Sequence, residues 1–142
     1  MDTEASKVGI VIVTHGHFGQ ALIDAAELIV GPQENVLSLC VDGTKGIDAA
    51  VESLKKFISQ VKSNAGVLIL TDMFGGTPTN LSLSLLQQDD IEVVTGVSLP
   101  MLLKALQKRT DSLQNMAEEV SRAGIKGIVI AGEMLRKRTS KG

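Results

Sequence analysis

Short unbroken apolar runs alternate along the chain with longer segments whose apolar residues are spaced three or four positions apart. Unbroken runs rich in Val, Ile and Leu are typical of strands covered on both faces, as in a parallel sheet flanked by helices. The predicted strands are Lys7–Val13, Val36–Val41, Gly66–Thr71 and Ile91–Thr95, with a short fifth strand at Gly127–Ala131.

The segments between these runs have the spacing of amphipathic helices. Leu22, Ala25, Ala26 and Ile29, for example, fall at i, i+3, i+4 and i+7, which puts them on one helix face. The predicted helices are His17–Val30, Ile47–Val61, Pro78 to about Gln87 with Thr77 as its N-cap, Leu99–Leu106, and Ser112–Ala123. Strands alternating with helices predict an α/β fold with a doubly wound, mostly parallel sheet, for which we expect the order 2-1-3-4.

Length and composition narrow the class of protein. We expect one domain over all 142 residues, with a core at 7–131 and polar tails at both ends, the last of them basic and solvated. A single cysteine, Cys40, the lack of a signal-peptide pattern and the absence of a membrane-spanning apolar run predict a reduced, cytoplasmic protein. The net charge of −2 and the scarcity of aromatic residues argue against nucleic-acid or direct carbohydrate binding.

Polar residues suited to one site follow three of the predicted strands. Thr14 and His15 follow the first strand, Asp72, Gly75, Gly76 and Thr77 follow the third, and Ser98 follows the fourth. In the order 2-1-3-4 the first and third strands are neighbours, so His15 and Asp72 could touch at the carboxyl edge of the sheet, where ligands bind in such folds.

A carboxylate next to a histidine ring has a chemical consequence. If Asp72 accepts a hydrogen bond from one ring nitrogen of His15, the other nitrogen keeps its lone pair and can act as a nucleophile. The paired glycines allow close approach of the backbone to a ligand, and a helix that starts near Thr77 offers amides and a positive dipole end to an anion such as phosphate.

Each of these residues also has a purely structural interpretation. His15 taken alone could be a structural histidine, and Asp72 and Thr77 could be turn and cap residues. His17 could complete a metal site, but its sequence neighbourhood lacks other ligands, so we expect a polar residue at a helix start. Cys40 fits a small buried apolar residue better than a reactive thiol, and Met73 and Phe74 could form an apolar lip over the site or pack elsewhere.

With these residues identified, the sequence resembles the IIA component of the mannose family of the bacterial phosphoenolpyruvate-dependent sugar phosphotransferase system. Three blocks in the family's order carry the resemblance: IVTHGHFGQALIDAAELIVG, VLILTDMFGGTPTNLSL and VVTGVSLPMLLKAL. The resemblance implies that His15 accepts a phosphoryl group from the phosphohistidine of HPr and passes it to a IIB component. It implies that Asp72 partners the histidine and that a phosphate pocket is lined by Thr14, Gly75, Gly76, Thr77 and Ser98, with Thr77 where serine is frequent.

The resemblance also carries expectations about assembly. It implies no cofactor or metal, a homodimer in which the last strand is exchanged in antiparallel pairing, and an indirect membrane link through a IIC/IID transporter. Three alternatives remain open: a phosphoryl donor for a dihydroxyacetone kinase system, a regulatory module phosphorylated on His15, and a plain anion-binding module.

Overall fold

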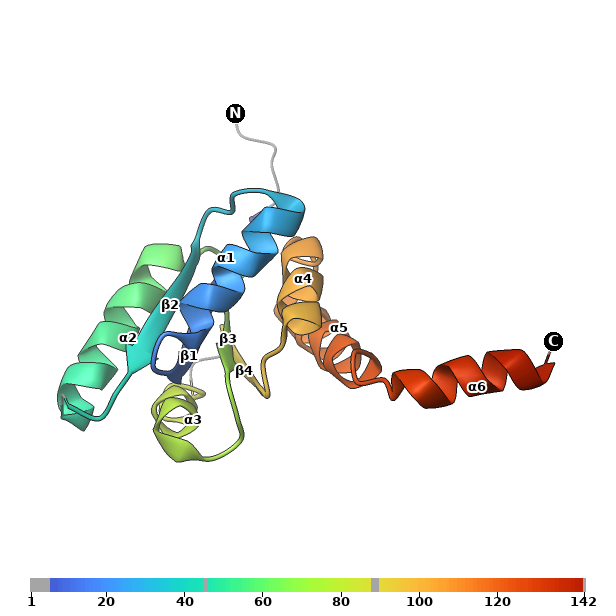
Figure 1. Cartoon of the computed structure of the whole chain (residues 1–142). Coiled ribbons are helices and arrows are strands. Elements are labelled where there is room, and N and C mark those ends of the chain that lie inside the picture. Colours follow the sequence, from blue (N-terminus) through green and yellow to red (C-terminus); the bar gives the residue numbers. More distant parts are fainter. Residues whose placement is uncertain (1–5, 45, 88–89, 142) are drawn as a thin grey trace.

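The structure is a computed structural model that describes residues 6–44, 46–87 and 90–141 (Figure 1). A four-stranded parallel sheet in the order β2-β1-β3-β4 lies at its centre, which confirms the predicted order. The strands are β1 (Gly9–His15), β2 (Val36–Val41), β3 (Val67–Thr71) and β4 (Ile91–Thr95). The central strands β1 and β3 are adjacent, so their carboxyl ends share the middle of one sheet edge.

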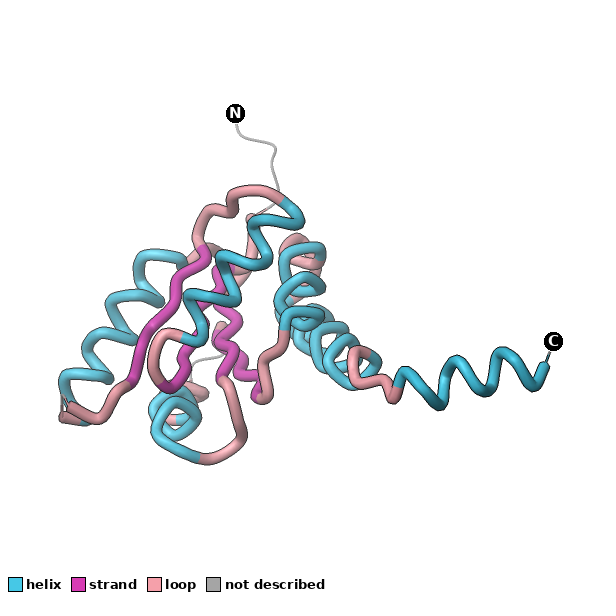
Figure 2. Tube along the Cα trace, in the orientation of Figure 1, coloured by secondary structure: helices cyan, strands magenta, loops and turns pink. Residues whose placement is uncertain are grey.

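Helices cover both faces of the sheet (Figure 2). They are α1 (Phe18–Val30), α2 (Ile47–Val61), α3 (Gly76–Leu83), α4 (Leu99–Gln107), α5 (Leu113–Lys126) and α6 (Ala131–Lys141). None of the helices in the described ranges is long and apolar enough to cross a membrane.

The core consists of two apolar clusters, one on each face. On one face, Ile10 and Ile12 of β1 pack with residues of α1, α4 and α5. On the other face, Val11 and Val13 of the same strand pack with residues of α2 and α3. Successive side chains of a strand point to opposite faces, so β1 has no polar residue until Thr14. This explains why the apolar run is unbroken up to Val13.

Two predicted boundaries at this edge were wrong. The strand β1 extends through Thr14 and His15, so His15 is its last residue and does not lie in the following turn. The third helix starts at Gly76 and ends at Leu83, earlier than predicted, and its N-cap position is Gly75. Thr77 therefore lies inside the first turn, and the structure shows no side-chain cap at this helix.

The predicted fifth strand is absent from the described chain. Ile128–Ile130 form a connection without regular structure between α5 and α6. A strand needs hydrogen bonds to a neighbouring strand, and among the described residues this segment pairs with no strand. The predicted basic tail is part of α6, which projects away from the domain (Figure 1). The predicted polar tail at the N-terminus lies almost entirely outside the described residues.

Candidate functional site

The sheet brings His15 and Asp72 into contact. Val13 of β1 is paired in register with Thr71 of β3, so the residues that follow leave the sheet side by side. The Asp72 Oδ2 atom lies 2.7 Å from His15 Nδ1 and also accepts a hydrogen bond of 2.9 Å from the His15 backbone N–H. One carboxylate oxygen therefore holds both the backbone and the ring of His15.

The ionisation of Asp72 is tuned by this contact. Burial alone would raise the pKa of Asp72, but the two hydrogen bonds from His15 and its charge outweigh burial and lower it below its usual value of 3.8. An ionised carboxylate only accepts hydrogen bonds, so the Nδ1 atom of His15 must carry the proton. In neutral His15 the lone pair then lies on Nε2.

The free Nε2 atom faces Gly76, the first residue of α3. A Cβ atom on Gly76 would lie 3.5 Å from Nε2 and 3.3 Å from Cε1 of His15. The φ angle of Gly76 is +79°, a left-handed conformation that glycine adopts readily. The start of α3 is thus next to the ring nitrogen that can react, and its free amides and positive dipole end suit an anion there.

The other predicted site residues differ in burial and in their hydrogen-bond partners. Thr14 is fully buried, and its hydroxyl accepts a hydrogen bond of 2.9 Å from the Gly19 N–H at the start of α1. Thr77 is exposed in the first turn of α3. Ser98 caps α4 by accepting a hydrogen bond of 3.4 Å from the Met101 N–H. The structure thus brings His15, Asp72 and Gly76 into one cluster, and it gives Thr14 and Ser98 contacts with helix starts.

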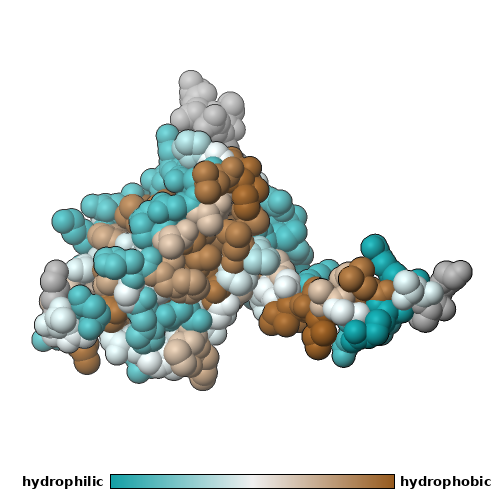
Figure 3. Space-filling model, viewed as in Figure 1, coloured by the Kyte–Doolittle hydropathy of each residue, from teal (hydrophilic) through white to brown (hydrophobic). Residues whose placement is uncertain are grey.

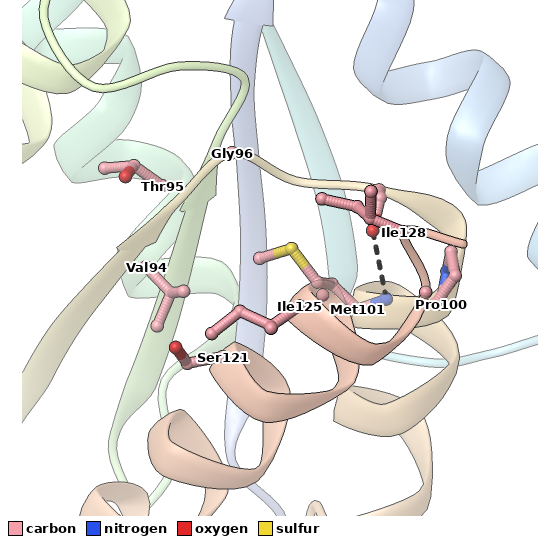
Figure 4. A pocket seen from close by; sticks show the side chains of 11 residues that line it. Val94, Thr95, Gly96, Pro100, Met101, Ser121, Ile125 and Ile128 are labelled. Atoms are coloured by element: carbon pink, nitrogen blue, oxygen red, sulfur yellow. Dashed lines mark hydrogen bonds between the residues drawn. The ribbon is translucent and has the colours of Figure 1, made fainter. Parts of the chain in front are cut away.

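Ser98 also lines a cavity of about 280 Å³ between β4, the start of α4 and the end of α5 (Figure 4). Met101 of α4, Ile125 of α5 and Ile128 of the connection that follows α5 border this cavity. The strand β4 is at the edge of the sheet, so no strand in the described part of the chain pairs with its outer side. This cavity and strand edge form a surface that the sequence analysis did not single out.

Three large apolar side chains that lie near His15 or Asp72 in the sequence are exposed at the surface. Phe18 is 46 % exposed, Met73 53 % and Phe74 78 %. Phe18 begins α1 three residues after His15, while Met73 and Phe74 follow Asp72 directly. The prediction of an apolar lip at Met73 and Phe74 is consistent with this exposure, and the sequence analysis missed Phe18. We call these three residues the apolar rim.

His17 and Cys40 are separated in the sequence but line the same cavity, which has a volume of about 260 Å³ and lies beside the end of β2 and the first turns of α2. His17 occupies the N-cap position of α1, without a side-chain cap. Among the described residues, no three His, Cys, Asp or Glu side chains are close enough to hold a metal ion.

Two buried threonines behind the site were also missed. Thr71 ends β3 and Thr79 lies in α3, and their Oγ1 atoms are 2.9 Å apart. Neither residue belongs to a recognisable sequence motif. Their spacing in the sequence therefore does not predict that their hydroxyls meet. They matter because Thr71 directly precedes the loop that holds Asp72, and Thr79 lies in the first turn of the helix that follows this loop.

Comparison with known proteins gives consistent matches. Residues 9–123 match the EIIA-man family model, described as the PTS system fructose IIA component. The chain is 32 % identical over 127 residues to the mannose-specific EIIAB component of Escherichia coli K12, covering 85 % of this chain and 39 % of that protein. It is 27 % identical to the fructose-specific EIIA component of Bacillus subtilis, covering 92 % of this chain and 90 % of that protein.

Solved structures show the same fold. The EIIA component of Streptococcus agalactiae superposes with a TM-score of 0.80 at 30 % identity, covering 89 % of this chain and 98 % of that chain. A PTS IIA protein associated with a fucose utilization operon of Streptococcus pneumoniae superposes with a TM-score of 0.82 at 27 % identity, covering 93 % and 99 %.

Proposed function

The chain belongs to the EIIA-man family of phosphotransferase-system IIA components, and from this premise we propose that it is a phosphocarrier that receives a phosphoryl group on His15. The donor is phospho-HPr and the acceptor is a IIB component. Because the chain spans 39 % of the length of its EIIAB relative from Escherichia coli, we assign the IIB step to a separate domain or chain.

The transfer is a direct exchange between nitrogen atoms. The lone pair on His15 Nε2 attacks the phosphorus atom while the bond from phosphorus to the donor's ring nitrogen breaks, so the phosphoryl group moves and His15 becomes a positively charged ring. Asp72 Oδ2, 2.7 Å from Nδ1, stabilises that charge. In the second step the same bond to Nε2 breaks as the IIB acceptor attacks.

One observation carries this proposal: the Nδ1 atom of His15 is held by Asp72 while Nε2 is left facing the start of α3. A plain anion-binding module needs no such tautomer control, because a fixed positive charge would serve it better. The remaining predicted pocket residues, Thr14, Gly75, Thr77 and Ser98, are proposed to line the phosphate site from the carboxyl ends of β1, β3 and β4 and the segments that follow them.

The apolar rim supports a protein as the phosphoryl donor. Phe18, Met73 and Phe74 are large and exposed, and clustered exposed apolar side chains mark protein-interaction surfaces. A small phosphorylated metabolite would instead need a concave site with charged side chains for its phosphate. The transfer would thus occur inside a transient protein–protein contact that covers the rim and excludes water.

We also propose that the protein is a homodimer formed by exchange of the segment Gly127–Ala131. Ile125, Ile128, Val129 and Ile130 are all at least half exposed. Figure 3 shows an apolar patch where α6 leaves the domain. The strand β4 borders the same cavity as Gly127 and Ile128, and its outer edge pairs with no strand among the described residues, so a partner's strand could pair with it.

Incubation with phosphoenolpyruvate, enzyme I and HPr tests the proposal. We expect intact mass to increase by one phosphoryl group, in an acid-labile form, in the wild type and not in His15→Ala. Phosphorylation of His15→Ala, or no adduct on the wild type when HPr is shown to be phosphorylated, would contradict it.

The acceptor is tested separately with purified recipients. We expect a mannose-family IIB component to discharge the phosphorylated protein, while a dihydroxyacetone kinase subunit does not. Stable phosphorylation that no recipient removes would favour the regulatory role instead. Association with a IIC/IID transporter, the expected membrane link, would follow from a productive IIB contact.

A further inference from the structure

We propose that Thr71 and Thr79 are positioning residues for phosphoryl transfer, because their buried hydroxyls hold the loop that aims Asp72 at His15. This inference rests on the proposed function of His15. It concerns the segment 71–79, which runs from the last residue of β3 through the loop 72–75 into the first turn of α3 and contains Asp72, Gly75 and Gly76.

The two hydroxyls form a short chain of hydrogen bonds. Both threonines are fully buried, with their Oγ1 atoms 2.9 Å apart, and Thr79 Oγ1 also donates a short hydrogen bond to the Met73 carbonyl. The Thr71 hydroxyl also donates to the Met73 carbonyl, at 3.5 Å. Each hydroxyl has one hydrogen, so with the Thr79 hydrogen on the Met73 carbonyl, Thr71 is the donor wherever the two hydroxyls bond to each other. Both hydroxyls thus converge on the Met73 carbonyl.

This use of a helical hydroxyl is unusual within α3. Ser82 donates to the Pro78 carbonyl at 2.8 Å, the ordinary contact four residues back along the helix. Thr79 instead reaches the Met73 carbonyl, which lies six residues back and outside the helix. Its hydroxyl thus joins the helix to the preceding loop.

The chain fixes the backbone on both sides of Asp72. Thr71 precedes Asp72, and its own carbonyl accepts a hydrogen bond of 2.8 Å from the Val97 N–H. Met73 follows Asp72, and its side chain is exposed, so packing does not hold it. The next residues that define the loop, Gly75 and Gly76, have positive φ angles and an intrinsically permissive backbone. The hydroxyl chain is the buried polar contact that limits this freedom.

The position of Asp72 matters because its contact with His15 is made by one oxygen atom. Oδ2 makes both contacts with His15, and Oδ1 is buried without a hydrogen-bond partner in the described structure. A shift of the loop would lengthen the contact that fixes the ring tautomer. Misplacement of a reacting group by about 1 Å can reduce a rate by roughly 100-fold.

The test compares Thr79→Val, which removes the hydroxyl at nearly constant volume, with Thr79→Ser, which retains it. The control is Ser82→Ala, which removes a buried hydroxyl of the same helix that does not touch the loop. We expect the rate of phosphorylation by saturating phospho-HPr to fall by about 10- to 100-fold in Thr79→Val. The phosphorylation rates of Thr79→Ser and Ser82→Ala should stay within about threefold of the wild-type rate. A tenfold loss of rate in Thr79→Val would be clearly distinct from that range.

A spectroscopic signature separates positioning from loss of stability. In long-range ¹H–¹⁵N spectra at a pH where His15 is neutral, the wild type should show the tautomer with the proton on Nδ1. We expect Thr79→Val to show a mixture of both tautomers while thermal unfolding still shows a folded protein. Thr71→Val should give the same change, and the double variant should add little, because both residues belong to one chain.

The outcomes that overturn the inference are specific. A folded Thr79→Val with wild-type rate and tautomer would do so, as would an equal loss of rate in Thr79→Ser or Ser82→Ala. If Thr79→Val does not fold, Thr71→Val decides by the same two measurements. If the wild type itself accepts no phosphate, the proposed function fails, but the tautomer comparison still decides whether the hydroxyls position Asp72.

Discussion

At the scale of single residues, the reactivity of His15 depends on one carboxylate oxygen. Asp72 Oδ2 accepts hydrogen bonds from both the backbone and the ring of His15. These contacts fix the orientation of the ring and its tautomer. An orienting carboxylate of this kind lets the imidazole act as a nucleophile and stabilises the positive ring that forms during transfer.

Asp72→Asn should therefore retain the fold and slow phosphorylation of His15. The neutral amide has nearly the same shape but does not stabilise the charged ring, so we expect the rate to fall by at least about tenfold. Quenched-flow kinetics with phospho-HPr would measure it, with circular dichroism as the check on folding. An unchanged rate would remove Asp72 from the mechanism.

The lowered pKa of Asp72 also predicts a pH dependence of stability. A carboxyl group with a lower pKa in the folded state stabilises that state above its unfolded pKa, near 3.8, and the stabilisation is lost as pH falls through the folded pKa. Between pH 5 and pH 3 the wild type should lose more unfolding free energy in urea than Asp72→Asn. Parallel curves for the two proteins would show that this contact does not contribute.

Gly76 and Gly75 offer a matched pair of substitutions. Both have positive φ angles, so alanine strains the backbone similarly at either position. A Cβ on Gly76 would lie 3.5 Å from His15 Nε2, whereas a Cβ on Gly75 meets nothing within 4 Å. We expect Gly76→Ala to reduce phosphorylation at least about tenfold more than Gly75→Ala, because its methyl group takes the space of a phosphoryl oxygen. Equal effects in mass-spectrometric time courses would contradict this.

At the scale of elements, the opposite end of the sheet is held by a buried arginine. Arg109 is 6 % exposed, and its guanidinium donates to the carbonyls of Val8, Glu34 and Asn35 at 2.9, 2.7 and 3.2 Å. Burial lowers the pKa of this guanidinium, and the charge of Glu34 counteracts part of that effect. The side chain thus joins the segments that lead into β1 and β2.

Arg109→Leu should destabilise the fold by about 2–4 kcal/mol, because three carbonyls lose their donor. The control is Arg122→Ala, in which exposed ion pairs with Glu118 and Glu119 are removed at a cost of about 1 kcal/mol or less. Urea unfolding measures both. Since Arg109 is at the end of the sheet opposite His15, the folded fraction of Arg109→Leu should still be phosphorylated. A small loss of unfolding free energy would show that the three carbonyls find other donors.

The strands and their order could be predicted from the sequence because each strand is marked by a local run of apolar residues. Unbroken apolar runs placed β2 and β4 at their observed bounds, and the pairing of His15 with Asp72 followed from the strand order. Side-chain chemistry that depends on distant contacts was missed, as with the Thr71–Thr79 hydroxyls. Thr77-Pro78 has the pattern of a helix start and predicts one there. The helix instead starts at Gly76, after Gly75 at the N-cap position, and both glycines have positive φ angles.

For the segment Gly127–Ala131, the local sequence pattern predicts a strand that the structure does not contain. Its apolar, β-branched residues have the composition of a strand, but a strand forms only where another supplies hydrogen bonds. In the single chain Ile128–Ile130 has no such neighbour, and the segment is an exposed connection. In the proposed dimer this segment would gain a partner strand, so a measurement of oligomeric state tests the expectation.

At the scale of the whole molecule, we predict a dimer that the double variant Ile128→Asp/Ile130→Asp converts to a monomer. Ile128 and Ile130 are 83 % and 65 % exposed, and burying an isoleucine contributes about 1.5–3 kcal/mol, whereas an aspartate buried in its place carries an uncompensated charge. Leu28→Asp is the control, because Leu28 on α1 is 90 % exposed and far along the chain from the exchanged segment. Sedimentation velocity should show dimers for the wild type and for Leu28→Asp. A monomeric wild type would refute exchange, and a dimeric double variant would move the interface elsewhere, leaving the edge of β4 open.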